Sequence, residues 1–419
     1  MGHFLLQEEE MKQKSVIKAL FVVAVLLFAA GCKKTEKGNE VTPTVGASAG
    51  LQPTQPGTLT DTDGKEAQML RTLVEAGKLP PLSERLPTAD NIMTETSGTA
   101  GVYGESAKLA AISADTITRE LVSEGLFRYD ADGTIAPNIA KGYEVNIDFT
   151  TYIIYLREGM RWSDGVPFTS DDCIFFYEHM CQKQTFGESL WECFLAYKSD
   201  GTAVPAVFTK IDNYSFRVTF SSSKPDFLEK LLAQGGICFA PEHYHVNLLP
   251  EYMGEDAALA KAKDMGYANT AEMLRAAVQN AWNIAGMPTL NPFCLSTEEE
   301  AKDVNGNYYE FIRNPYYWKV DAQGKQLPYL DKLEFTRISG EEQCLLLTTE
   351  GYLSVGSLTA GQIEEAEAEK ERGGYRLVSW SNSLYWAVDN KLKNFRETYS
   401  HEVTVRGLGA AHAECWYFE

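Results

Sequence analysis

The chain has 419 residues and carries 58 acidic against 38 basic side chains, which gives a formal net charge of −20. This length exceeds one compact core and fits about two or three domains. So acidic a chain repels nucleic-acid phosphates, and we therefore expect no nucleic-acid partner. The acidity also has a simpler explanation, namely that it keeps a globular protein in solution.

The first residues of the chain have the layout of a secretory signal. Three lysines between positions 12 and 18 precede an uncharged run over residues 19–30. That run is too short for a membrane span, which needs about 20 apolar residues. We predict that residues 1–32 are a signal segment and that Met11, directly before the first lysine, is the true start.

The signal ends in Ala29-Ala30-Gly31-Cys32, which resembles the bacterial lipoprotein box. In that box the cysteine is acylated and becomes the first residue after cleavage. The resemblance implies that Cys32 carries a lipid anchor, which holds the protein to the outer face of the cytoplasmic membrane, in the periplasm or cell envelope. Position 29 of the box is usually Leu, and ordinary signal cleavage near Ala30 is the alternative.

A tether follows the signal. Residues 33–57 are rich in Lys, Thr, Gly, Ser and Pro and contain no aromatic residue, so they cannot bury enough surface to order themselves. We predict a flexible tether over residues 33–95. For residues 61–102 two alternatives stay open: the stretch extends the tether, or it packs on the domain with a short helix over residues 66–76.

The cysteines do not suggest a disulfide framework. The chain has eight, and those other than Cys32 form an odd set without C-x-x-C spacing. Several lie in apolar surroundings, such as Cys173 and Cys238. We expect buried free thiols.

Strand and helix signals alternate through the rest of the chain, which predicts a mixed α/β protein with several sheets. A capping box of Thr169 and Asp172 predicts the start of a helix. Alternating or β-branched stretches predict strands over residues 150–157, 215–220, 308–313 and 375–380. Apolar residues at helical spacing predict helices from Pro225, from Thr270 and over residues 362–372.

No catalytic arrangement with adequate spacing is present, and we expect neither a catalytic residue nor a cofactor. His243 and His245 would share a side of a strand and could bind a metal together with a third ligand, but no third ligand is indicated. Two partly exposed histidines after Pro241 are the alternative. We therefore expect no metal site.

Three motifs in chain order resemble one family. They are Glu124-Gly125-Leu126-Phe127, then Leu156-Arg157-Glu158-Gly159-Met160-Arg161-Trp162-Ser163-Asp164-Gly165 with Pro167-Phe168-Thr169, and finally Arg313-Asn314-Pro315-Tyr316-Tyr317-Trp318. The chain resembles the family 5 extracellular solute-binding proteins, which are the oligopeptide- and dipeptide-binding proteins of ABC transporters. The resemblance covers about residues 110–390. The motif residues make turns and aromatic anchors and identify the family without contacting the ligand.

The resemblance implies a two-lobed periplasmic-binding-protein fold of type II that closes like a hinge on its ligand. We expect lobe I with an extra subdomain over residues 96–335 and the start of lobe II over residues 336–419. The match fades after Asn394, and from about residue 395 the tail lacks family character. We therefore expect an incomplete second lobe and hypothesise a frameshifted or truncated reading frame.

The resemblance also suggests where a ligand binds. Asp115 and Thr116 align with a cleft-lining segment, in which Asp115 would receive a peptide ammonium; a helix N-cap is the alternative. Tyr385, Trp386 and Asn390 match a second such segment, with buried packing as the alternative for the two aromatic residues.

The function that we expect is capture of peptides by a monomeric binding protein and their delivery to the permease complex of an ABC transporter. An oligosaccharide or a metal chelate is an alternative ligand, and aromatic residues such as Trp282 would suit sugar stacking. A secreted hydrolase, which would need paired carboxylates in a cleft, and a non-functional remnant are the alternatives from other classes.

Overall fold

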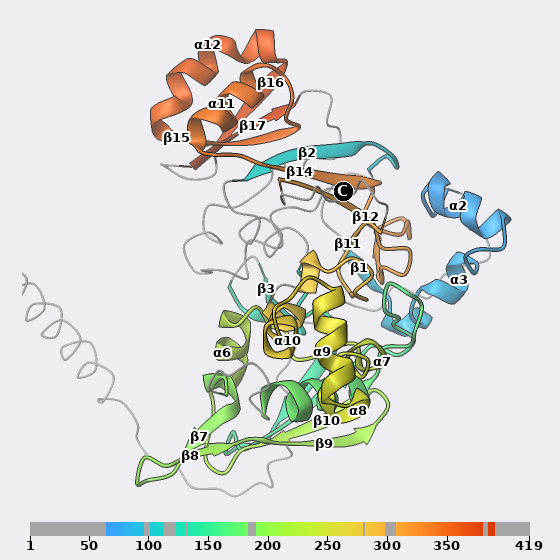
Figure 1. The fold of residues 1–419 in the computed structure, drawn as a ribbon, viewed down its shortest axis with the longest axis vertical. Helices are drawn as coiled ribbons and strands as arrows, with labels where there is room; N and C mark the ends of the chain where they lie inside the picture. Colours follow the sequence, from blue (N-terminus) through green and yellow to red (C-terminus); the bar gives the residue numbers. More distant parts are fainter. Residues whose placement is uncertain are drawn as a thin grey trace, which may run out of the picture. The chain divides into compact units, whose positions relative to one another are not determined.

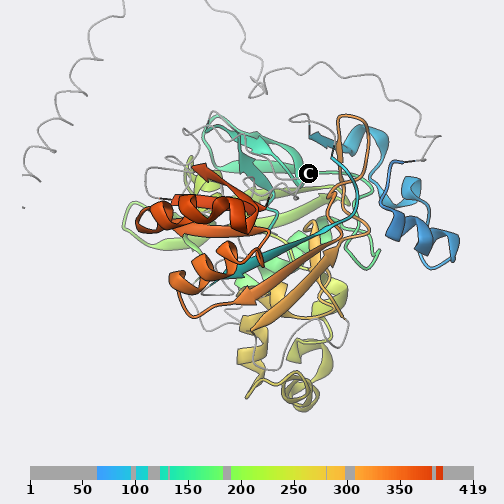
Figure 2. The ribbon, with the colours of Figure 1, turned by 90° about the horizontal axis from the view of Figure 1, so that it is seen from above.

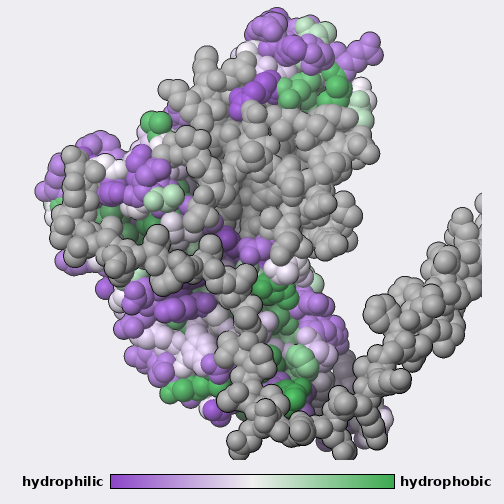
Figure 3. Space-filling view, turned by 180° about the vertical axis from the view of Figure 1, so that it is seen from behind, coloured by the Kyte–Doolittle hydropathy of each residue, from purple (hydrophilic) through white to green (hydrophobic). Residues whose placement is uncertain are grey.

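The structure is a computed structural model that describes residues 64–95, 101–111, 123–130, 133–182, 190–279, 281–297, 307–379 and 384–389. The predicted signal segment, the tether up to residue 63 and the tail beyond residue 389 therefore lie outside the described residues. None of the described helices has the length and apolar character that a membrane span requires. On the face drawn in Figure 3, the described residues are mostly hydrophilic, with smaller hydrophobic areas.

The segment 64–95 packs on the domain through a fully buried arginine. Arg85 pairs with Glu66, and its guanidinium also donates to Pro315 O at 2.5 Å and to Gln326 Oε1 at 3.1 Å. The segment holds α2 (Gln68–Glu75), α3 (Leu82–Arg85), η1 (Ala89–Asn91) and β1 (Met93–Glu95). Of the two alternatives, packing on the domain is the correct one here, and a tether that extends to residue 95 was wrong for this part.

A seven-stranded sheet combines strands from distant parts of the chain (Figures 1 and 2). Three neighbouring strands, β14, β2 and β15, run parallel. The strands in sheet order are β11 (Phe293–Leu295), β12 (Tyr308–Arg313), β14 (Lys332–Arg337), β2 (Ser106–Ala111), β15 (Val355–Thr359), β17 (Leu384–Asp389) and β16 (Tyr375–Ser379). The predicted strand over residues 308–313 is confirmed as β12, and that over residues 375–380 as β16, apart from its last residue.

The strand pairing of this sheet concerns the lobe boundary that we expect between residues 335 and 336. Residues 335 and 336 are consecutive residues of β14, and β14 is an interior strand between β12 and β2. On the far side of β2, Val355 of β15 pairs with Leu109. Because one sheet continues across residues 335 and 336, a lobe boundary between them does not fit the strand pairing.

Helices α11 (Glu341–Thr349) and α12 (Ile363–Gly373) cover one face of this sheet (Figure 1). Leu358 of β15 is buried with Leu345 and Ala366 of these helices. A 3₁₀ turn, η5 (Ala360–Gln362), leads from β15 into α12. The helix predicted over residues 362–372 is confirmed, and Gly374 ends it in the left-handed conformation.

A second, four-stranded antiparallel sheet forms the centre of the main hydrophobic core. Its strands are β5 (Ala140–Val145), β6 (Thr151–Leu156), β10 (Ser215–Thr219) and β9 (Val207–Asp212). Alternate residues of β6 are buried, as a strand with one covered face requires. The predicted strands over residues 150–157 and 215–220 are confirmed within one residue at each end.

The predicted capping box begins a helix as expected. Thr169 is the N-cap of α5 (Ser170–Phe175), and its backbone N–H donates to Asp172 Oδ2 at 2.9 Å. The helix continues as a π-helix, η2 (Phe176–Cys181), which the sequence pattern did not predict. Trp162, in the turn before this helix, is buried against Phe168 with 5.5 Å between ring centroids.

The remaining elements surround this core. The helices are η3 (Glu192–Phe194), α6 (Phe227–Ala233), α7 (Glu242–His245), α8 (Pro250–Met253), α9 (Glu255–Asp264), α10 (Thr270–Gln279) and η4 (Ala281–Asn283). Two-stranded sheets pair β1 with β13 (Lys319–Asp321), β3 (Phe127–Tyr129) with β4 (Ile135–Pro137), and β7 (Leu195–Tyr197) with β8 (Ala203–Pro205). The predicted helices near Pro225 and from Thr270 are confirmed as α6 and α10.

The described cysteines are free thiols. Five of them are buried, namely Cys173, Cys181, Cys193, Cys238 and Cys344, and Cys294 is half-buried. Burial raises the pKa of the Cys294 thiol to about 12. The prediction of buried free thiols is therefore confirmed for this set, while Cys32 and Cys415 lie outside the described residues.

Candidate functional site

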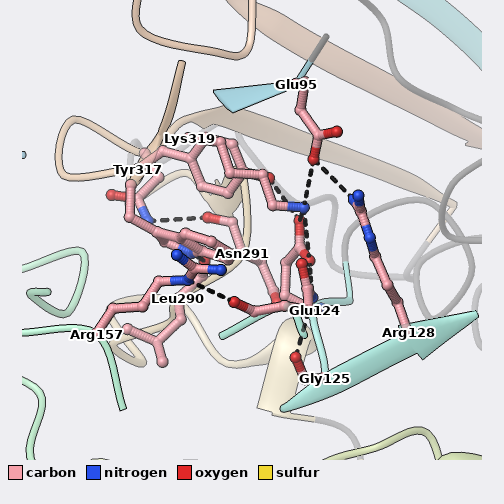
Figure 4. Close-up of polar contacts among 12 residues, drawn as sticks. Glu95, Glu124, Gly125, Arg128, Arg157, Leu290, Asn291, Tyr317 and Lys319 are labelled. Atoms are coloured by element: carbon pink, nitrogen blue, oxygen red, sulfur yellow. Dashed lines mark hydrogen bonds and ion pairs between the residues drawn. The ribbon is translucent and has the colours of Figure 1, made fainter. Parts of the chain in front are cut away.

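A buried cluster of charges connects the family motifs (Figure 4). Lys319 has no exposed surface, and its Nζ lies 3.3 Å from Glu95 Oε1 and 3.1 Å from Glu124 Oε1. Arg128 Nη1 lies 2.8 Å from the same Glu95 oxygen. Burial alone would raise the pKa of Glu95, but the charges of Lys319 and Arg128 outweigh it and lower the pKa to about 2.

Glu124, from the first motif, is the centre of this cluster. Its carboxylate accepts hydrogen bonds from Tyr317 Oη at 2.5 Å and Asn138 Nδ2 at 2.6 Å, besides its contact with Lys319. Its backbone N–H donates to Asn291 Oδ1 at 2.8 Å. Each carboxylate oxygen thus has at least one donor, as a buried anion requires.

Arg157, from the second motif, completes the cluster. Its Nε donates to Asn138 O at 2.7 Å, and its guanidinium lies 5.5 Å from the ring centroid of Trp318 in the third motif. Burial, followed by repulsion from Arg128, lowers the pKa of Arg157 to about 10. The three motifs therefore meet in one buried network that holds the fold together.

The carboxyl ends of the parallel strands form an edge that suits ligand binding better than the buried charge cluster does. β14, β2 and β15 end at Arg337, Ala111 and Thr359, which places their carboxyl ends at the same edge of the sheet. In open α/β sheets ligands bind outside the carboxyl ends of parallel strands. Helices α11 and α12 both begin just after this edge.

At this edge, one face of the seven-stranded sheet points away from α11 and α12. Leu358 and Ala110 pack towards α11 and α12, whereas Val355 and Leu109 pair with each other on the other face. Because side chains alternate along a strand, Ser357 lies on that other face, two positions after Val355. Ser357 is exposed, whereas Val355 is buried. This face therefore becomes accessible towards the carboxyl edge.

Arg337 lies on the same face and at the same edge. It pairs with Ala111 in the β14–β2 register and lies two positions after the buried Phe335, which pairs with Leu109. Its side chain is exposed. We refer to the positions Arg337, Ala111, Ser357 and Trp386, which follow one another across β14, β2, β15 and β17, as the edge row.

The structure brings two of the predicted ligand residues to this edge. Trp386 and Tyr385 are consecutive on β17, where Trp386 pairs with Ser357 and Tyr385 pairs with Leu358. The register thus gives Trp386 a place in the edge row, and it gives Tyr385 a partner that is buried under the helices. Asp115, Thr116, Asn390 and Cys32 lie outside the described residues; Asp115 and Thr116 follow the carboxyl end of β2 by a few residues.

Sequence reasoning missed Arg337 and Ser357. Neither belongs to a motif, and an arginine or serine at the end of a strand has no local signature of binding. Only the pairing of β14, β2 and β15, which come from distant parts of the chain, brings them to one edge.

The two histidines near Pro241 differ from the expectation. They lie on the short helix α7 rather than on a strand, so positions two apart do not share a side. His245 is buried and its Nδ1 lies 2.9 Å from Pro241 O, whereas the half-exposed His243 pairs with Asp164 at 2.8 Å. Within the described part of the chain, no group of three or more His, Cys, Asp or Glu side chains is arranged to hold a metal ion.

The fold is that of the periplasmic binding proteins. A solved oligopeptide-binding protein OppA superposes with a TM-score of 0.64 at 26% identity, covering 75% of this chain and 49% of that one. The binding protein MelB from Agrobacterium fabrum, solved in complex with stachyose, superposes with a TM-score of 0.53 at 24% identity, covering 74% and 46%. The second likeness concerns the fold alone.

A family model, described as bacterial extracellular solute-binding proteins, family 5 Middle, matches residues 134–404. The chain therefore belongs to the family 5 solute-binding proteins. A periplasmic α-galactoside-binding protein of Rhizobium meliloti is 29% identical over 298 residues, which cover 62% of this chain and 37% of that protein. The periplasmic oligopeptide-binding protein OppA of Salmonella typhimurium is 28% identical over 145 residues, which cover 32% and 26%. The chain thus spans less than half the length of these relatives.

Proposed function

We propose that this protein captures peptides outside the cytoplasm and delivers them to the permease of an ABC transporter for uptake. The observation that carries the proposal is the family match over residues 134–404, together with the structural likeness to an oligopeptide-binding protein. The relatives are named as binding proteins, which supports a role in binding rather than in catalysis.

The candidate site supports this proposal. We infer that ligand is held at the carboxyl edge of β14, β2 and β15, where Trp386 has a place in the edge row. Asp115, Thr116, Tyr385 and Asn390 remain proposed ligand contacts, with buried packing as the alternative for Tyr385, whose partner in the strand register is the buried Leu358.

We also propose two lobes that close on the ligand as a hinge, with closure as the signal to the permease. The seven-stranded sheet, including β15, would belong to the first lobe, and the second would begin further along the chain. We propose that the protein acts as a monomer and is held to the membrane through a lipid on Cys32.

An oligosaccharide is the second candidate ligand. It is favoured by the identity of 29% with a protein named as an α-galactoside-binding protein. Aromatic faces such as that of a tryptophan bind sugars and peptide side chains alike, so the aromatic residues of the chain do not choose between the two.

Thermal unfolding of the full chain, with a mixed peptide library and with a panel of oligosaccharides, tests the proposal. A ligand that binds only the folded protein raises the midpoint, by the equivalent of about 2.7 kcal/mol at a hundredfold excess over Kd. A shift with peptides would support peptide uptake, and a shift with oligosaccharides alone would support the second candidate. A cooperative transition that neither ligand class moves would contradict both.

A further inference from the structure

Four free thiols lie together in the main hydrophobic core. They are Cys173 on α5, Cys181 at the end of η2, Cys193 on η3, and Cys238 in the segment before α7. All four are buried, and the other three each interact electrostatically with the thiol of Cys238. Folding therefore gathers thiols from separate stretches of the chain into one core without joining any of them in a disulfide.

The folded protein protects these thiols from oxidation. Only a thiolate attacks a disulfide, so a thiol reacts slowly where its pKa is high. Burial raises the pKa of Cys193 to about 12, and it also raises the pKa values of Cys173 and Cys181. Between these last two on the helix, the buried Tyr177 stacks on Phe208 with 4.0 Å between ring centroids. An oxidant in solution therefore reaches the four thiols only when this core opens.

The unfolded chain lacks this protection, and Cys181 then has the nearest partners in sequence. Cys173 lies eight residues before it, and Cys193 lies twelve residues after it. Because loop closure costs less entropy for short loops, these pairings are favoured over those with Cys238. Family 5 solute-binding proteins act outside the cytoplasm, in compartments such as the periplasm, where disulfides form and persist. A chain that folds there meets disulfide oxidants before its core has closed.

A disulfide between Cys173 and Cys181 is incompatible with the fold. In the folded protein α5 and η2 form one continuous helix between the two residues. Eight residues of α-helix span about 12 Å, whereas Cα atoms joined by a disulfide lie at most about 7 Å apart. The wider turns of the π-helical part shorten this span by too little to close the difference. A chain that carries this disulfide therefore cannot form the helix that fills the core.

We propose that the redox state of Cys181 controls folding, because a disulfide formed with Cys173 before the core closes prevents α5 and η2 from forming. The disulfide arises by exchange with an external disulfide oxidant. The Cys181 thiolate attacks the oxidant and releases its first thiol, and the Cys173 thiolate then attacks Cys181 Sγ in the mixed disulfide and releases the second. The two cysteine protons pass to the released thiols, so one disulfide forms in the chain and one is reduced. After the core has closed, the same oxidant has no effect.

Refolding of the full chain from urea, with and without oxidised glutathione, tests this redox control. The amplitude of the cooperative unfolding transition measures the refolded fraction. We expect the oxidant to lower the refolded fraction of wild type severalfold when it is present during refolding, and to leave it unchanged when it is added afterwards. Cys181→Ala, which removes the shared partner of both short loops, should refold equally well with and without the oxidant.

Cys344→Ala is the matched control, because Cys344 is a buried free thiol on α11, outside this core, and its loss should leave the sensitivity of wild type intact. Each comparison is a ratio within one variant, so a lower overall yield does not obscure it. Peptide mapping of wild type refolded with the oxidant should find Cys173 joined to Cys181 as the main product. A different main product, a wild type that the oxidant does not affect, or a Cys181→Ala variant as sensitive as wild type would overturn the proposal. Loss of structure when the oxidant is added to the folded wild type would overturn it as well.

Discussion

Two buried groups near α7 have pKa values shifted in opposite directions. Burial raises the pKa of Asp172, which caps α5 and accepts a hydrogen bond from the Glu242 backbone N–H, to about 6. Burial lowers the pKa of His245, at the other end of α7, to about 4. The folded state thus favours the neutral form of both side chains, and α7 should respond to pH through both of its ends.

The two shifts predict opposite dependences of stability on pH. The pKa of His245 is below its unfolded value of about 6.5, so its contribution is complete above pH 6.5 and is lost as pH falls towards 4. At pH 5 the free energy of unfolding has lost about 2 kcal/mol of this contribution. The pKa of Asp172 is above its unfolded value, so its contribution is present at low pH and is lost as pH rises from about 4 to 6; at pH 5 it adds about 1.4 kcal/mol relative to neutral pH.

Urea unfolding at pH 7.5 and pH 5 separates the two groups. For each protein we compare the free energy of unfolding at pH 5 with that at pH 7.5. In His245→Gln this change should be about 2 kcal/mol more favourable than in wild type, because the loss from His245 is absent and only the contribution of Asp172 remains. Asp172→Asn should show the reverse, with a steeper loss at pH 5. Parallel pH profiles in all three proteins would contradict these shifts, whatever the absolute stabilities.

At the scale of elements, the glycine of the first motif allows two loops to pack closely. A Cβ at position 125 would lie 3.0 Å from both Gly235 O and Gly236 Cα, which are backbone atoms and would have to shift to make room for it. The Leu126 backbone N–H donates to Gly236 O at 2.9 Å in the same contact. Gly125→Ala should therefore destabilise the protein by about 1–3 kcal/mol through overpacking, measured by urea unfolding.

Gly142→Ala is the control for that change. Gly142 lies in β5, and a Cβ there would meet no atom within 4 Å. Its substitution should change stability by less than about 0.5 kcal/mol. Equal effects of the two substitutions would mean that the loss of backbone freedom, rather than the close approach at Gly125, decides the result.

Local patterns predicted some elements well and others poorly. β12 was predicted with correct bounds, and its residues alternate between half-buried and buried. The Thr169–Asp172 capping box marked the start of α5. The π-helix η2 was not predicted, because the stripe of apolar residues at helical spacing does not reveal a change in hydrogen-bond register. His243 and His245 suggested a strand because three residues alone cannot distinguish a strand from a single helical turn.

The candidate site needed information that no local pattern contains. Arg337 and Ser357 come together only through the parallel pairing of β2 with β14 and with β15, across long stretches of chain. The motifs, in contrast, predicted the family because their turns and aromatic anchors are local. They also proved to be structural, since Glu124 and Arg157 lie in one buried network with Lys319.

At the scale of the whole molecule, the proposed place of action depends on Cys32. If this cysteine carries acyl chains, each methylene buried in the bilayer adds about 0.8 kcal/mol to the free energy of membrane binding. Two or three such chains retain a protein at a membrane. We expect the wild-type chain to fractionate with membranes and to incorporate a labelled fatty acid. Cys32→Ala should abolish the labelling, because an alanine cannot be acylated.

Cys294→Ala is the control for the anchor, since Cys294 is a half-buried free thiol on β11 and its loss should leave labelling intact. Treatment of intact cells with protease, with cytoplasmic proteins protected, would show whether the anchored domain lies outside the membrane. Labelling of Cys32→Ala at the wild-type level would contradict the anchor. An unlabelled wild type found free of membranes would instead support ordinary signal cleavage near Ala30, and the protein would then meet its permease by diffusion.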